Sequence, residues 1–186
     1  MKSFLLLFLI VLPILEFGMT SVGGQEETMI YVVPPIVSVG LGETFTVEVK
    51  VANVLNLYTY QFKLSWEPSL LNVTGVTEGS FLNAEGHYRT SFTPRIYNTP
   101  DPFGVSGYVY VACTLLGEPA TAAASGSGTL ATLEFLVKED GNTSLHLYDT
   151  KLISSLMVEM SHGTEDSYFQ SLPPPEIRVE PSSVVD

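Results

Sequence analysis

Strict alternation of apolar and polar residues marks the stretch from Glu43 to Val76, ETFTVEVKVANVLNLYTYQFKLSWEPSLLNVTGV. The first run places four apolar residues on one side of the chain: Phe45, Val47, Val49 and Val51. The second run does the same with Tyr58, Tyr60, Phe62, Leu64 and Trp66, and leaves Thr59, Gln61, Lys63 and Ser65 on the other side. Because successive side chains of a strand point to opposite faces, each run predicts a strand with one buried and one solvent-facing side. A second sheet must then cover the apolar sides.

Further strands are predicted on both sides of this stretch, for about eight or nine in all. They cover an edge strand over 29–39 that Pro34 and Pro35 interrupt, and strands over 70–76, 107–116, 130–137, 144–148 and, as the last, 156–160. Residues 88–107 contain several prolines and are expected to be irregular, with at most short strands near Phe92 and Tyr97. Turn signals at this spacing, without an amphipathic helical window, are typical of an all-β sandwich or barrel.

The N-terminus has the pattern of a secretory signal peptide. Lys2 precedes the apolar run FLLLFLIVLPIL, which is short for a membrane span, and the small residues of Ser21-Val22-Gly23 suit a signal peptidase. We therefore expect a signal peptide over 1–24, a β-sandwich domain over 28–170 and an extended Pro-rich tail over 171–186. The prediction is a secreted, extracellular protein with no membrane attachment after cleavage; an uncleaved anchor is the alternative.

Charge and cysteine content exclude some classes of function. The chain has 8 Lys and Arg against 20 Asp and Glu, a net charge of −12, so a nucleic-acid backbone would be repelled. Cys113 is the single cysteine and cannot form an intramolecular disulfide. Its apolar neighbours in VYVACTLL predict a buried small side chain instead of a nucleophile.

Catalytic and metal-binding motifs are missing from the sequence. His87, His146 and His162 are far apart, and no HExxH, CxxC, EF-hand, GxSxG or Walker pattern occurs. The spacing of the acidic residues singles out no pair of carboxylates for glycoside hydrolysis. We therefore expect a non-catalytic protein without a cofactor or metal. The sequons Asn72-Val73-Thr74 and Asn142-Thr143-Ser144 make Asn72 and Asn142 glycosylation candidates, although such triplets also arise by chance.

The order of the segments resembles a cohesin domain over about residues 37–169. VGLGETFTVEVKVANVLNLYTYQFKLSWEPSLLNVTGVTEGSFL is similar to the first half of that family, where two such strands precede a "v-x-x-G-x-f" turn. GYVYVACTLLG, SGSGTLATLEFLVK and DGNTSLHLYDTKL follow in the order of the second half. The chain differs at Trp66-Glu67-Pro68, where the family favours Tyr-Asp-Pro. The resemblance implies a nine-stranded antiparallel β-sandwich with jelly-roll topology.

The resemblance also implies a function in binding dockerin modules, as in polysaccharide-degrading assemblies. Cohesins bind them with a flat sheet face that includes the outward side of the strand matching residues 56–66. Carried over to this chain, the partner-binding positions are Thr59 and Gln61, with Tyr97 as an aromatic contact from the following segment. The family usually has Asn and Asp at the first two positions, so this chain differs there.

Two other functions stay open at this point. The jelly-roll fold is shared with carbohydrate-binding modules, so the partner is either a dockerin-bearing protein or a polysaccharide. Sugar rings stack on exposed aromatic side chains, and the candidates for this are Tyr88, Phe92, Tyr97 and Phe103. Trp66 falls on the inward side of its strand and is expected in the core. A structural component of the cell surface is the remaining alternative.

Overall fold

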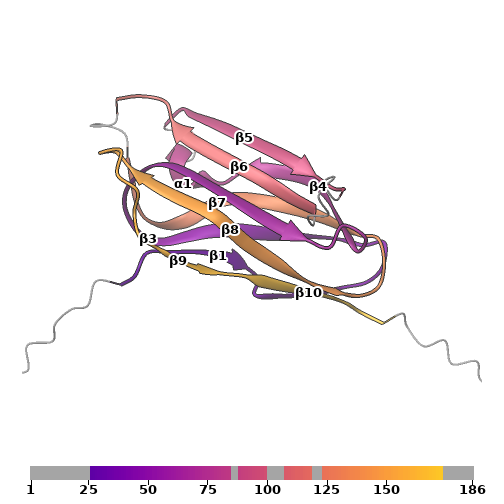
Figure 1. Ribbon diagram of the computed structural model, residues 1–186. Coiled ribbons are helices and arrows are strands. Elements are labelled where there is room, and N and C mark those ends of the chain that lie inside the picture. Colours follow the sequence, from indigo (N-terminus) through magenta and orange to yellow (C-terminus); the bar gives the residue numbers. More distant parts are fainter. Residues whose placement is uncertain (1–25, 85–87, 100–106, 119–122, 174–186) are drawn as a thin grey trace, which may run out of the picture.

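A computed structural model describes residues 26–84, 88–99, 107–118 and 123–173 (Figure 1). The signal peptide expected over 1–24, residues 174–186 of the expected tail, and the candidates His87 and Phe103 lie outside these ranges. Across the residues that are described, the helical content is too short to provide a membrane-spanning segment.

The described residues form two facing layers of β-strands with one short helix (Figure 1). The elements are β1 Met29–Val33, β2 Ile36–Val39, β3 Thr44–Trp66, β4 Leu71–Glu78, α1 Ser80–Asn83, β5 Thr90–Tyr97, β6 Gly107–Leu115, β7 Ala124–Val137, β8 Asn142–Ser154, β9 Gly163–Glu165 and β10 Ser167–Ser171. Pairing gives the order β9-β1-β3-β7-β4 in one layer and β5-β6-β3-β8-β10-β2 in the other. The all-β sandwich expected from the alternation is confirmed.

Strand β3 belongs to both layers. Its first half pairs with β1 and β7, and its second half pairs with β6 and β8. The change occurs around Asn53 and Asn56, which both have a φ of 56°, a left-handed conformation that asparagine tolerates better than most residues. Their backbone N–H groups donate to Ser127 Oγ (3.1 Å) and Ser125 Oγ (2.8 Å). The sequence predicted two strands here, and the structure has one bent strand because β7 follows it through the bend.

Strand number and direction differ in detail from the expectation. The structure has ten strands in its described part, where the resemblance implied nine. Most pairs are antiparallel, but β1 pairs with β9 and β2 pairs with β10 in parallel. Pro34 and Pro35 separate β1 from β2, and β2 is an edge strand, whereas β1 lies between β3 and β9.

One local prediction was incomplete and one was wrong. The continuous strand β5 joins the short strands that were expected near Phe92 and Tyr97, and Pro94 fits there because β5 is an edge strand next to β6. Residues 156–160 do not form the last strand. The Met157 N–H donates to Ser154 O (2.9 Å) in a turn, and Leu156 is 81% exposed. The last strands are β9 and β10, which pair with the N-terminal strands.

The core lies between the layers and contains the residues that the alternation placed inward. Phe62 and Leu64 are fully buried, and Trp66 is 1% exposed, as predicted. The Trp66 indole N–H donates to Leu71 O (2.9 Å), and the Tyr60 hydroxyl donates to Leu130 O (2.6 Å). The polar atoms of both side chains are therefore hydrogen-bonded despite their burial. The opposite sides of the strands face away from the core and are available for contacts with other molecules.

Gly79 is expected to tolerate no side chain. A Cβ at this position would collide with the backbone oxygen of Thr129 on β7, and the Gly79 N–H donates to Leu130 O (2.9 Å). We expect Gly79→Ala to lower the free energy of unfolding by about 1–3 kcal/mol in urea titrations, because the backbone must move. Gly40→Ala is the control, since its Cβ would meet Glu43 at an ordinary 3.5 Å. Equal stability of both variants would contradict the prediction.

Candidate binding face

The outward side of the adjacent strands β5, β6, the second half of β3, and β8 forms one continuous surface, which we call the 5-6-3-8 face (Figure 1). Pairing and burial place these side chains on it: Ser91, Thr93, Arg95 and Tyr97 from β5; Tyr108, Tyr110, Ala112 and Thr114 from β6; Thr59, Gln61, Lys63 and Ser65 from β3; and His146, Tyr148 and Lys151 from β8. On β6 and the second half of β3 these residues alternate with buried ones, so the same periodicity that forms the core also creates this face.

All three positions carried over from the resemblance lie on this face. Thr59 bonds its neighbour on β6, with 2.7 Å between Thr59 Oγ1 and Thr114 Oγ1. The Gln61 amide donates to Asp149 O (3.5 Å) on β8. Tyr97 is the last residue of β5 and is 41% exposed. Gln61 and the row that holds Tyr97 are roughly 13 Å apart along the strands, given a rise of about 3.3 Å per residue. The three residues therefore mark different parts of one surface.

Tyrosines gather toward the end of the face that contains Tyr97. The rings of Tyr97 and Tyr108 stack with centroids 4.6 Å apart. The Lys63 ammonium lies 5.9 Å from the Tyr108 ring and 5.7 Å from the Tyr148 ring, within the range of cation–π attraction. Lys63 Nζ also pairs with Asp149 Oδ2 at 2.9 Å, and this hydrogen bond raises the pKa of the lysine. Lys63 thus holds two rings of the face in place.

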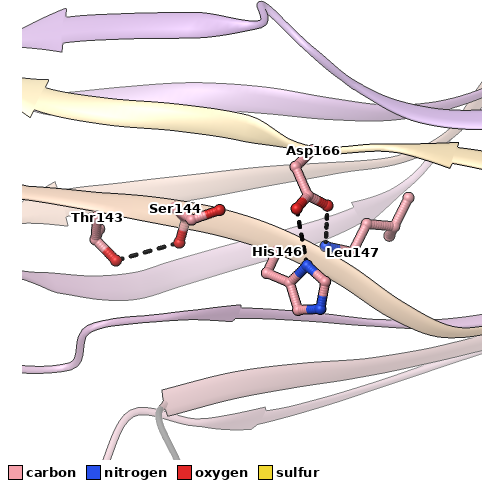
Figure 2. A network of polar contacts seen from close by, with 5 residues as sticks. All are labelled: Thr143, Ser144, His146, Leu147 and Asp166. Carbon is pink, nitrogen blue, oxygen red and sulfur yellow. Dashed lines mark hydrogen bonds and ion pairs between the residues drawn. The ribbon is translucent and has the colours of Figure 1, made fainter.

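A polar contact orders the rim of the face next to β8 (Figure 2). The Asp166 carboxylate, from the turn between β9 and β10, lies 2.8 Å from His146 Nδ1 and accepts the Leu147 backbone N–H at 2.8 Å. The His146 ring stacks on Tyr148, with centroids 5.6 Å apart and planes 2° apart. The carboxylate therefore fixes the orientation of an imidazole that supports a tyrosine of the face.

The sequence contained a signal for the central tyrosines that the motif-based reasoning missed. In GYVYVACTLL, Tyr108 and Tyr110 occupy the polar phase of the alternation, opposite Val109 and Val111. Two large aromatic residues on the solvent side of a strand are unusual enough to indicate a contact surface. The position of Lys151 on the face was harder to predict from the sequence. Asp149, with a φ of 49°, lies in a bulge of β8 just before Lys151, and a bulge interrupts the alternation of side chains.

The glycosylation candidates lie away from the middle of this face. Asn72 is half-buried in β4, which is in the other layer. Asn142 is exposed at the start of β8, and its Oδ1 accepts the Tyr168 hydroxyl at 2.8 Å. Modification of either asparagine stays a prediction.

The two histidines that the structure describes make separate contacts. His162 bonds Met160 O and Thr150 Oγ1, whereas His146 bonds Asp166. The described His, Cys, Asp and Glu residues contain no group that could hold a metal ion.

The sugar-binding candidate Tyr88 lines a hollow of about 470 Å³ beside α1 and the start of β7, together with serine, alanine, glycine and Phe81. Phe92, a further candidate, packs partly buried against the core.

Cys113 lies in the core and is expected to be unreactive in the folded protein. Burial and the nearby Glu78 carboxylate raise its pKa from 9.0 to about 12, so the thiolate is about a thousand times scarcer at pH 8. We expect alkylation by iodoacetamide at pH 8 to be at least about 100-fold slower in the native protein than in 8 M urea, measured by mass spectrometry. Equal rates in the two conditions would show that the thiol is accessible.

Comparisons with known proteins identify relatives of this fold. The family model described as "Cohesin domain" matches residues 31–166. No curated protein sequence matches the chain. A non-cellulosomal cohesin from the archaeon Archaeoglobus fulgidus is 18% identical, with 79% of this chain and 92% of that one covered and a TM-score of 0.62. The sixth cohesin of scaffoldin B from Acetivibrio cellulolyticus, solved with a Cel5 dockerin, is 15% identical over 78% and 99% (TM-score 0.62). A type II cohesin from the cellulosome of the same species is 17% identical over 77% and 95% (TM-score 0.60).

Proposed function

This chain belongs to the cohesin family, and from that premise we propose that it is a non-catalytic module that binds a dockerin-bearing protein through the 5-6-3-8 face. The observation that carries the proposal is the cluster of outward tyrosines, Tyr97, Tyr108, Tyr110 and Tyr148, in two adjacent rows of a continuous four-strand surface. Tyrosine and arginine are enriched where proteins bind each other, and this face contains both.

Support for the individual contacts comes from their positions. Thr59 and Gln61 present a hydroxyl and an amide at one end of the face, and Tyr97 presents an exposed ring at the other. A bound partner that contacts all three would cover the tyrosines between them. Structural neighbours with this fold are described as complexes with dockerins, which supports the same class of partner.

We propose further that the module works outside the cell, in polysaccharide breakdown. The apolar N-terminal segment with its small-residue cleavage site supports export. One structural neighbour is described as part of a cellulosome, which supports the second point, and another as non-cellulosomal. N-terminal sequencing of the exported protein would test the first point. A start near residue 25 is expected, and retention of Lys2 would contradict cleavage.

A polysaccharide partner is the second candidate, and one observation favours it. The stacked pair Tyr97–Tyr108 presents aromatic surface to solvent on a flat face, the arrangement that sugar rings use. Retention of the purified domain on insoluble cellulose or xylan would support it. If the domain is washed off while a known carbohydrate-binding module stays on the same matrix, a polysaccharide partner is excluded.

Calorimetric titration tests the main proposal. Each dockerin module encoded by the source organism is produced separately and titrated into the domain at micromolar concentration. At least one is expected to bind in a 1:1 ratio, and Tyr31→Ala, on the outer side of the other layer, should bind it as the wild type does. No heat of binding with any dockerin would overturn the proposal.

A further inference from the structure

Positive charge is concentrated on the 5-6-3-8 face of an otherwise acidic protein. The chain carries a net charge of −12. On the face, however, the charged side chains are Lys63, Arg95 and Lys151 against Asp149, with the Asp166 carboxylate at the rim beside His146. The sign of this surface is therefore opposite to that of the whole molecule, which points to a role for the cations in recognition.

Only part of this charge is neutralised within the molecule. Lys63 and Asp149 form an ion pair at 2.9 Å, so their charges largely cancel. The described residues contain no carboxylate in an ion pair with Arg95 or Lys151, and both of these side chains are exposed. The face thus presents two cations that have no acidic partner within the described part of the domain.

Screening makes these local charges more important than the total. At physiological ionic strength the Debye length is about 8 Å, so acidic residues farther away have little effect on a bound group. Arg95 on β5 and Lys151 on β8 are three strand spacings apart, roughly 15 Å at about 4.8 Å per spacing. One carboxylate cannot reach both cations, so two separate acidic groups are needed, one on each side of Tyr110 and Lys63.

We propose that the partner of this module has an acidic contact surface, with at least two carboxylates that pair with Arg95 and Lys151 on either side of the central tyrosines. The proposal rests on the proposed function, because it specifies the chemistry of the protein that binds the same face. Arginine can hold a carboxylate through two parallel hydrogen bonds, which makes Arg95 the more selective of the two contacts.

A pair of double variants tests this inference. R95E/K151E reverses both cations of the face, and K50E/K138E makes the same change in net charge elsewhere, since Lys50 lies in the first half of β3 and Lys138 follows β7. Both are titrated with the dockerin that binds wild type most tightly. We expect R95E/K151E to bind at least about 30-fold more weakly and K50E/K138E within about 3-fold of wild type. Thermal melts confirm that both are folded.

The outcomes separate the two proposals. Binding by R95E/K151E within about 3-fold of wild type, or equal weakening of both variants, would overturn the acidic partner and leave dockerin binding intact. Recovery of R95E/K151E binding when the contacting Asp or Glu of the dockerin is changed to Lys would support the pairing directly. No binding of wild type to any dockerin would overturn the proposed function and this inference together.

Discussion

Phe135→Ala is expected to lower the free energy of unfolding by about 3–5 kcal/mol, the largest effect of a single substitution that we expect in this protein. Phe135 is fully buried on β7 and connects aromatic side chains of both layers. Its ring stacks on Phe45 (5.2 Å) and meets the edge of Trp66 at 89° (5.2 Å). Removal of the ring leaves a cavity between the layers.

Urea unfolding followed by tryptophan fluorescence measures this effect, since Trp66 contacts the altered site. Domains of this size have a stability of about 5–15 kcal/mol, so the loss can unfold a substantial fraction of the protein. Phe135→Leu retains much of the volume and should lose less than the alanine variant. Tyr168→Ala, at a position that is 41% exposed, should cost less than about 1 kcal/mol. A loss below 1 kcal/mol in Phe135→Ala would contradict the packing described here.

Tyr108→Ala is expected to weaken partner binding by about 30-fold, which corresponds to about 2 kcal/mol, with little change in stability. Tyr108 lies in the row of the 5-6-3-8 face that contains Tyr97, between the Tyr97 ring and the Lys63 ammonium. Aromatic side chains whose neighbours exclude water are the ones that dominate binding energy. Since the side chain points outward from β6, its removal leaves the core intact.

Calorimetry with the best-binding dockerin measures the dissociation constants, and urea unfolding of the same samples measures stability. Tyr31→Ala removes an outward tyrosine from the other layer and should leave the dissociation constant unchanged. If Tyr108→Ala and Tyr31→Ala bind equally well, the partner does not use the tyrosine cluster of this face. A loss of stability above about 2 kcal/mol in Tyr108→Ala would instead assign the ring a structural role.

Alternation alone predicted the strands whose two sides face different surroundings. The runs through Phe62, Val111 and Phe135 each have one side in the core and one side in solvent, so their period of two is visible in the sequence. Strand β5 was predicted only as short pieces because an edge strand can contain Pro94 and expose most of its side chains. Residues 156–160 were misassigned because their apolar side chains lie in an exposed turn, where hydrophobicity does not indicate burial.

The binding face could be predicted only in part. Periodicity assigned Thr59 and Gln61 to the solvent side, but it could not say which strands stand beside them. The contact of Lys63 with Asp149, and the row that leads from Tyr97 to Tyr108, depend on pairing between segments far apart in the chain. A short stretch of sequence does not specify which distant strand it pairs with, because register across a sheet is set by the packing of the whole sandwich.

The parallel pairing of the first and last strands determines how the domain would bear a mechanical load. β1 and β2 run alongside β9 and β10 in the same direction, so the chain enters at one end of the sandwich and leaves at the other (Figure 1). Tension applied between Met29 and Ser171 would act along these strands, in shear. Their ladder hydrogen bonds, with those from Gly163 to Thr28 and from Leu172 to Val39, would then share the force and have to rupture together.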